Sequence, residues 1–269
     1  MQVYRRLDIG TAKPSRALRE EIPHHAIDLV EPDDPMSAGR YSAYARRAAL
    51  DIQRRDKCPI LCGGTGLYAR AFAGGLVEGV ASTPSLRTEL ESRPTVALRQ
   101  ELEQRDPVAA ERIASGDRVR MVRALEIASL GGARPSELRT LHGFGDRPFR
   151  MIWLGLRMER EPLWDLLRTR VEQMFQGGLV EEVRELRRTG FSPTLRALNS
   201  IGYRQAGQVI DGEIDEASAR EAAWIATRRY AKRQLTWFRA EPELQWLDAA
   251  RPAEILDEAL ERFEAAATG

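Results

Sequence analysis

The fold class is decided by residues 24–64, which read HHAIDLVEPDDPMSAGRYSAYARRAALDIQRRDKCPILCGG. Short apolar runs open and close this stretch, at His24–Val30 and Cys58–Gly64, and such runs between Pro, Gly and His clusters are typical of strands. The segment between them, Ser37–Arg54, has apolar residues three and four positions apart, which predicts an amphipathic helix. These residues are Tyr41, Tyr44, Ala48 and Ile52. A helix that crosses over between two parallel strands is a βαβ unit, so the sequence predicts an α/β fold.

Helical periodicity replaces this pattern from Thr83 to about Gly132. Apolar residues separated by charged residues and chain breakers are Leu86, Leu90, Leu98, Leu102, Val122, Leu125 and Ile127. We therefore expect a helical insertion over residues 83–145. It would separate a partial α/β core at 1–82 from the remainder of the core, with C-terminal helices, at 146–269.

The last part of the chain is predicted to rejoin the sheet and then to be mostly helical. RMIWLGL at Arg150–Leu156 follows the turn residues GDRP and predicts a further buried strand. Leu163–Gly190 includes a long helix with one apolar stripe, and Ala217–Phe238 predicts another helix. The stripe consists of Val171, Met174, Phe175, Leu179, Val183 and Leu186. A short strand is expected at Leu244–Leu247.

Composition indicates an ordinary globular protein. Forty-one basic and 40 acidic residues leave a net charge of +1, so an anionic partner must be held by a local patch. The two cysteines, Cys58 and Cys62, lack the further ligands of a zinc site, so no metal site is predicted and we expect reduced, structural thiols. No apolar run approaches the ~20 residues that cross a bilayer. We therefore expect a cytoplasmic protein without a membrane segment.

Two glycine-containing loops are candidates for binding. LDIGTAKPS brings Gly10, Thr11 and Lys13 together in a candidate anion-facing loop, although a loop of this kind is more often an ordinary turn. GGTGLY at Gly63–Tyr68 ends a predicted strand, where glycine lets a ligand approach the backbone. A tight turn into a helix remains the alternative there.

Basic residues gather in three later segments. Arg120 and Arg123 of DRVRMVRALEI share a helix face, which suits either phosphate binding or a solvated surface. Residues 222–239, AAWIATRRYAKRQLTWFR, mix cations with aromatic side chains and contain no acid. Such a mixture suits phosphate contacts and base stacking, while a basic helix paired with acids elsewhere is the alternative. NSIGYRQ at Asn199–Gln205 adds an amide, a phenol and a guanidinium.

The order of these motifs resembles that of the tRNA dimethylallyltransferase family. The segments that carry the resemblance are VYRRLDIGTAKP, HHAIDLVEP, GGTGLY, DRVRMVRALEI, RVEQMFQGGLVEEV, IGYRQ and YAKRQLTWFR. The resemblance implies a fold similar to P-loop kinases, with a parallel sheet and a tRNA-facing helical insertion. It also implies transfer of a dimethylallyl group from its diphosphate to the N6 amine of the adenine 3′-adjacent to the anticodon.

The same resemblance assigns roles to single residues. Arg170 is implied to face the diphosphate as a catalytic residue, and Thr65 to lie at the reacting adenine and the RNA backbone. Many relatives have Arg where this chain has Leu166, so anion binding is expected to be modestly weaker. The implied tRNA-binding residues are Thr65, Arg87, Arg120, Arg123, Asn199, Ile201, Gly202, Tyr203, Arg204, Lys232, Arg233, Gln234, Thr236, Trp237 and Arg239. The implied partners are a tRNA anticodon stem-loop and dimethylallyl diphosphate, bound by a monomer.

Two elements of the family pattern do not occur in residues 1–269. These are an Asp-Ser pair that would directly precede Met1, whose Asp is the base, and a G-P-T-x-x-G-K-T phosphate loop that works with Mg²⁺. We expect that Met1 is an internal methionine of a D-S-M-Q-V-Y motif, that the first strand and the P-loop are missing, and that residues 1–269 alone transfer little. A catalytically dead tRNA-binding module and an adenylate isopentenyltransferase are the alternatives.

Overall fold

The computed structural model describes residues 1–76, 83–130, 134–142 and 145–268, which fall into two compact units. Unit 1 comprises Met1–Phe72 and Arg150–Gly269, and unit 2 comprises Ala73–Phe149. The helices of unit 1 are α1 (Arg16–Glu21), α2 (Ala38–Arg54), α3 (Gly66–Gly74), α9 (Arg160–Gln176), α10 (Leu179–Arg188), α11 (Tyr203–Ile210), α12 (Glu216–Arg239) and α13 (Pro252–Thr268). No described helix is long and apolar enough to cross a membrane.

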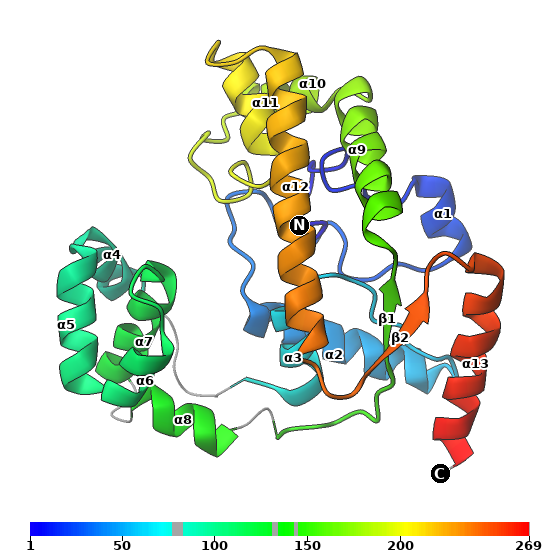
Figure 1. Ribbon diagram of the computed structural model, residues 1–269, viewed down its shortest axis with the longest axis horizontal. Coiled ribbons are helices and arrows are strands. Elements are labelled where there is room, and N and C mark those ends of the chain that lie inside the picture. Colours follow the sequence, from blue (N-terminus) through cyan, green and yellow to red (C-terminus); the bar gives the residue numbers. More distant parts are fainter. Residues whose placement is uncertain (77–82, 131–133, 143–144, 269) are drawn as a thin grey trace. The chain divides into compact units, whose positions relative to one another are not determined.

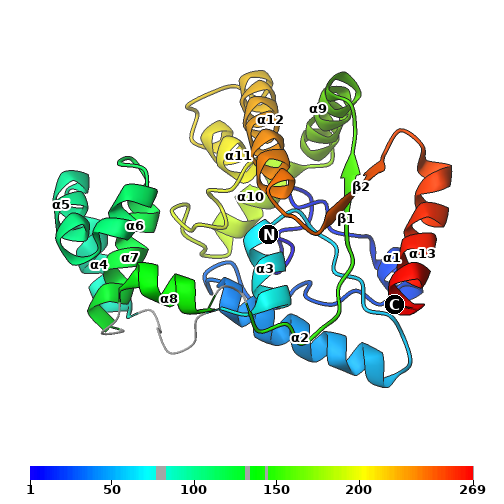
Figure 2. The same ribbon diagram turned by 60° about the horizontal axis from the view of Figure 1, so that its bottom comes forward.

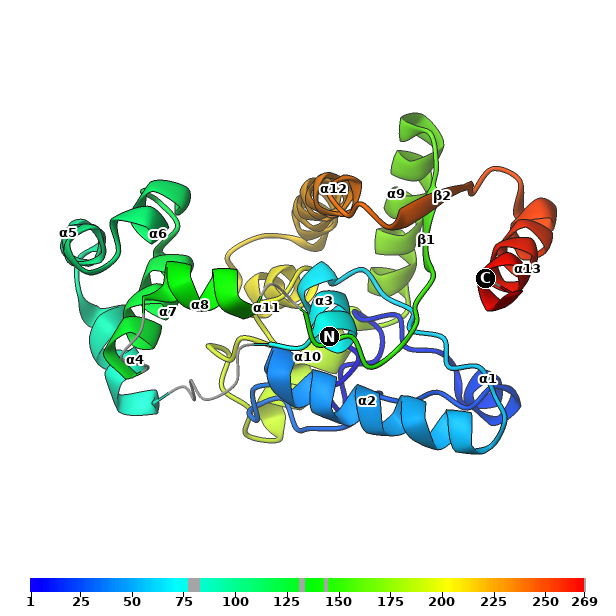
Figure 3. The same cartoon turned by 90° about the horizontal axis from the view of Figure 1, so that it is seen from below.

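Unit 1 contains a parallel pair of strands, β1 (Trp153–Arg157) and β2 (Leu244–Asp248), with Trp153 opposite Leu244. Both strands were predicted at these places. The expected burial of β1 is wrong, because Leu156 is 60% exposed. Helix α13 lies next to β2 (Figures 1 and 3), while α9 and α12 run side by side (Figures 1 and 2).

The two strands predicted in the first third of the chain do not form. Residues 24–30 make a single parallel bridge, between Tyr4 and Val30, and residues 58–64 are irregular, with Ile60 87% exposed. An apolar run becomes a strand only where a neighbouring strand accepts its hydrogen bonds, and no described strand lies beside these segments. The thiols of Cys58 and Cys62 are free and exposed, so their expected role in packing is wrong.

The predicted helices form, because their signals are local. Ser37 caps α2 by accepting a hydrogen bond from the amide of Arg40, as serine does at a helix start. The stripe predicted over Leu163–Gly190 packs into the main core, but it belongs to two helices. The chain turns between α9 and α10 at Gly178, whose φ of +97° is readily adopted only by glycine.

Unit 2 is helical throughout its described elements. These are α4 (Pro84–Ser92), α5 (Thr95–Arg105), α6 (Pro107–Arg112), α7 (Arg118–Leu130) and α8 (Pro135–His142). Leu90, Leu98, Leu102, Val122 and Leu125 form its core, as their spacing predicted. The carboxylate of Asp106 accepts hydrogen bonds from the amides of Ala109 and Ser136, which joins α6 to α8.

Candidate functional site

The GGTGLY motif forms an exposed turn that leads into α3. The carbonyl oxygen of Thr65 accepts hydrogen bonds from the amides of Tyr68 (2.9 Å) and Ala69 (3.1 Å), which closes the first turn of the helix. The Tyr68 hydroxyl donates to the carbonyl of Met36, and its ring lies 4.8 Å from that of Tyr41. These contacts fasten the turn to α2 and leave Thr65 exposed.

Helix α12 packs against this turn with the side chains of Gln234 and Trp237. The amide of Gln234 donates to the carbonyl of Gly64 at 2.8 Å, and the indole of Trp237 lies against Gly66. Both side chains are half-buried. The two residues were predicted to contact tRNA, but here they contact the protein's own chain.

The same helix presents its remaining predicted RNA contacts to solvent. Lys232, Arg233, Thr236 and Arg239 are all exposed. Lys232 and Arg239 form no ion pair or hydrogen bond through their side chains within the described part of the chain, and Arg233 stacks over the ring of Tyr230. The alternative in which acids neutralise this helix is therefore wrong for Lys232 and Arg239.

Arg170 lies on the exposed side of α9. Its guanidinium has no partner among the described residues, unlike that of Arg168, which pairs with Glu221 at 3.3 Å and stacks on Trp224 at 3.9 Å. Leu166 stands one helical turn before Arg170 and is also exposed. Arg170 is thus an exposed cation of α9 that no acid neutralises among the described residues, and it is able to meet an anion.

The NSIGYRQ segment does not hold its polar groups together. Arg204 and Asn199 are exposed, but Tyr203 is only 1% exposed and Gly202 is buried, with a φ of +88°. The amide of Asn199 donates to backbone carbonyls of its own loop. Because Tyr203 and Gly202 are buried, their predicted direct contacts with RNA do not fit the structure. Ile201 is half-buried, so its exposure is intermediate between that of the buried pair and that of Asn199 and Arg204.

Glu182 is a residue that the sequence reasoning missed. One of its carboxylate oxygens accepts from the hydroxyl of Tyr203 at 2.5 Å, and the other accepts from the amides of Asp8 and Ile9. Burial, and then the charge of Glu182, raise the pKa of Tyr203 well above its ordinary value, so the phenol remains a donor. The pair of acids in GLVEEV, at a helix start, was the available signal.

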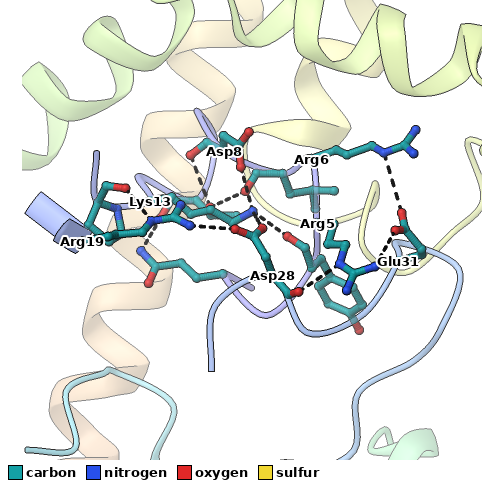
Figure 4. A network of polar contacts seen from close by, with 12 residues as sticks. Arg5, Arg6, Asp8, Lys13, Arg19, Asp28 and Glu31 are labelled. Carbon is teal, nitrogen blue, oxygen red and sulfur yellow. Dashed lines mark hydrogen bonds and ion pairs between the residues drawn. The ribbon is translucent and has the colours of Figure 1, made fainter. Parts of the chain in front are cut away.

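Lys13 is the centre of a polar network and not part of an anion-facing loop (Figure 4). Its side chain is 2% exposed and its ammonium donates to the carboxylates of Asp8 (2.7 Å) and Asp28 (2.5 Å) and to the carbonyl of Tyr4. Arg19 pairs with the second oxygen of Asp28 at 2.8 Å. The charge of Lys13 is therefore already neutralised, and the turn interpretation of LDIGTAKPS is confirmed.

Unfolding of unit 1 is expected to become easier in acid because of Asp28. Burial raises the pKa of this carboxyl, but hydrogen bonds from Lys13 and Arg19 outweigh it and hold the pKa below its ordinary value. Stability from the ionised form is thus complete above the unfolded-state pKa, about 3.9, and is lost as pH falls below it. Urea midpoints followed by tryptophan fluorescence from pH 6 to pH 3 measure this loss.

Asp28→Asn should lower the free energy of unfolding at pH 6 by ~1–2 kcal/mol. The urea midpoint of this variant should then fall less between pH 6 and pH 3 than that of the parent chain. The matched control is Asp33→Asn, at an exposed carboxylate without an ion pair among the described residues. Equal acid sensitivity in Asp28→Asn and the parent chain would contradict this prediction.

Two of the three predicted RNA-binding arginines of unit 2 lie beside a buried acid. Glu126 is fully buried, and its carboxylate lies 2.8 Å from the guanidinium of Arg123 and 4.0 Å from that of Arg87. Arg120 is 74% exposed and lies 3.4 Å from Asp117. Arg120 is therefore the freest of the three cations, while Arg87 and Arg123 are held by the fold of the unit.

The described residues do not bring together three or more His, Cys, Asp or Glu side chains that could hold a metal ion. They therefore do not fit a protein cage for Mg²⁺, and the expected Mg²⁺ stays a prediction.

Comparison with known proteins places this geometry in a family. A family model described as IPP transferase matches residues 2–241. A tRNA dimethylallyltransferase of Geobacter sulfurreducens is 44% identical over 252 residues, which cover 92% of this chain and 81% of the relative. The tRNA isopentenylpyrophosphate transferase structure from Bacillus halodurans matches with a TM-score of 0.70 at 33% identity, covering 99% of this chain and 87% of that one. A eukaryotic dimethylallyltransferase acting on tRNA matches with a TM-score of 0.80 at 26% identity, covering 97% and 71%. These neighbours confirm the predicted fold.

Proposed function

The chain belongs to the IPP transferase family, and from this membership we propose that it is a tRNA dimethylallyltransferase. The proposed acceptor is the N6 amine of the adenine 3′-adjacent to the anticodon, and the donor is dimethylallyl diphosphate. We further propose that the protein acts as a cytoplasmic monomer. A transfer assay with a radiolabelled donor and an anticodon stem-loop tests the reaction directly.

The reaction needs an oriented amine and a stabilised leaving group. The N6 lone pair forms a bond to C1 of the dimethylallyl group while the C1–O bond breaks, and the diphosphate leaves with the bonding electrons. N6 then gives its proton to a general base. Arg170, exposed and without a partner among the described residues, is suited to stabilise the negative charge on the departing diphosphate.

The observation that best supports a tRNA acceptor is that α12 carries two sets of side chains, one packed against the protein and one exposed. Gln234 and Trp237 pack against the turn that bears Thr65, whereas Lys232 and Arg239 of the same helix are exposed and carry no paired acid among the described residues. Exposed cations on a helix that is packed against the rest of the protein are suited to contact the phosphates of an RNA backbone. In unit 2, Arg120 is the proposed RNA-contacting cation, because it is 74% exposed, whereas Arg87 and Arg123 lie within 4.0 Å of the buried Glu126.

Replacing Lys232 with alanine is expected to weaken binding of the stem-loop to residues 1–269 and to reduce the slope of log K against log [salt] by about 1, because one phosphate contact is lost. Fluorescence anisotropy at several salt concentrations measures both quantities. The control is Arg16→Ala on α1, which removes another exposed cation and should change neither. A reduced affinity with an unchanged slope would argue against a phosphate contact.

A free adenine nucleotide is the competing acceptor. The exposed cations of α12 extend along several helical turns, which favours a polymer of phosphates over one phosphate group. We therefore expect that AMP in large excess does not displace a labelled stem-loop. Displacement by AMP would favour an adenylate isopentenyltransferase, and stem-loop binding without transfer in any form of the protein would favour a dead binding module.

A further inference from the structure

The glycines on both sides of Thr65 leave room for side chains of α12. A Cβ atom added to Gly64 would lie 1.9 Å from the amide nitrogen of Gln234, and one added to Gly66 would lie 2.3 Å from the indole ring of Trp237. Neither glycine has a positive φ, so these glycines provide space for the side chains and not an unusual backbone conformation. By contrast, a Cβ on Gly63 would meet no atom within 4 Å.

The indole of Trp237 is itself fixed in place. The guanidinium of Arg70 stacks over it at 4.5 Å from the ring centroid. Arg70 also pairs with Glu241 at 3.0 Å, and the Glu241 side chain is only 10% exposed. Because Arg70 belongs to α3 and Glu241 follows α12, this stack ties the helix that begins after Thr65 to the end of α12.

We propose that Gln234 and Trp237 are positioning residues that hold Gly64–Gly66 and thereby set where Thr65 meets the acceptor adenine. Gln234 fixes the carbonyl of Gly64 before Thr65, and Trp237 fixes Gly66 after it. Thr65 is the exposed residue between these two fixed points. The contact of Thr65 with the adenine rests on the proposed function. The fixation of Gly64–Gly66 by Gln234 and Trp237 does not.

Hydrogen exchange in residues 1–269 without RNA tests the hold on the turn. The amides of Tyr68 and Ala69 report it, because both donate to the carbonyl of Thr65. Gln234→Leu and Gly64→Ala should speed their exchange at least tenfold, since the first removes the amide and the second displaces it. Gly63→Ala is the matched control and should leave exchange unchanged, although it removes the same backbone freedom. Unchanged exchange in both test variants, with tryptophan fluorescence confirming a folded unit 1, would overturn the proposal.

A double-mutant cycle tests the link to the acceptor. Thr65→Val and Gln234→Leu should each weaken stem-loop binding several-fold, and the double variant should be no weaker than the worse single one, because Gln234 acts only by placing the hydroxyl that Thr65→Val removes. If the loss of affinity in the double variant equalled the product of the two single losses, Gln234 would contact RNA by itself, and the positioning role would be overturned. A parent chain that binds no stem-loop would refute the proposed function, while hydrogen exchange would still decide whether Gln234 holds the turn.

Discussion

Replacing Arg170 with alanine is expected to slow dimethylallyl transfer roughly 100- to 1,000-fold, the usual effect of losing one donor that stabilises charge in a transition state. Affinity for tRNA should hardly change, because this cation is proposed to face the diphosphate. The exposed guanidinium has no ion pair among the described residues, so no acid competes with the leaving group for it. Single-turnover transfer of a radiolabelled dimethylallyl group to the anticodon stem-loop measures this rate.

The control for this experiment lies two positions earlier on the same helix. Arg168→Ala removes an equal charge, but from a side chain engaged by Glu221 and Trp224, so transfer should fall much less. Binding of inorganic diphosphate to residues 1–269 gives a second readout and should weaken in Arg170→Ala only. Loss of tRNA affinity without loss of rate would show that Arg170 contacts RNA instead.

Replacing Tyr203 with alanine is expected to lower the free energy of unfolding of unit 1 by ~3–5 kcal/mol, as truncation of a buried aromatic residue does. The ring is buried in the main core and packs against Gly10 and Leu179. Tyr203→Phe should lower the free energy of unfolding by ~1–3 kcal/mol, because the carboxylate of Glu182 loses a hydrogen-bond donor. Urea unfolding followed by tryptophan fluorescence reports unit 1 alone, since all five tryptophans lie in it.

The neighbouring Arg204 provides the opposite case. It is exposed and has no ion pair among the described residues, so Arg204→Ala should leave stability within ~0.5 kcal/mol of the parent and weaken stem-loop binding instead. If Tyr203→Ala kept the parent midpoint and lost RNA affinity, the burial of Tyr203 in this structure would be contradicted.

Helices were predictable from the sequence, and strands only where they find a partner. The cap at Ser37 and the apolar stripe of α9 and α10 are encoded within a few residues of where they act. RMIWLGL became β1 because residues 244–248 pair with it, whereas His24–Val30 and Cys58–Gly64 have no described strand beside them. The division of α9 from α10 was signalled by Gly177 and Gly178, which the prediction passed over.

In the candidate site, sequence reasoning found the motifs but not the direction in which each side chain points. Lys13 belonged to a candidate anion-facing loop, but in the structure its ammonium pairs with Asp8 and Asp28. Tyr203 and Arg204 are neighbours in one motif, yet one is buried and the other exposed. Contacts such as that of Glu182 with Tyr203 join distant parts of the chain, and no local spacing predicts them.

The sequence by itself determined the family, the helices and the location of the basic segments, because ordered motifs, capping residues and charges are properties of the chain. Only the tertiary structure decided which cations remain unneutralised and why glycines flank Thr65. Burial, ion pairing and close approach depend on residues that are distant in sequence, such as Gln234 beside Gly64 and Asp28 beside Lys13. The assignment of Arg170 and Thr65 as the residues that meet the substrates therefore rests on both.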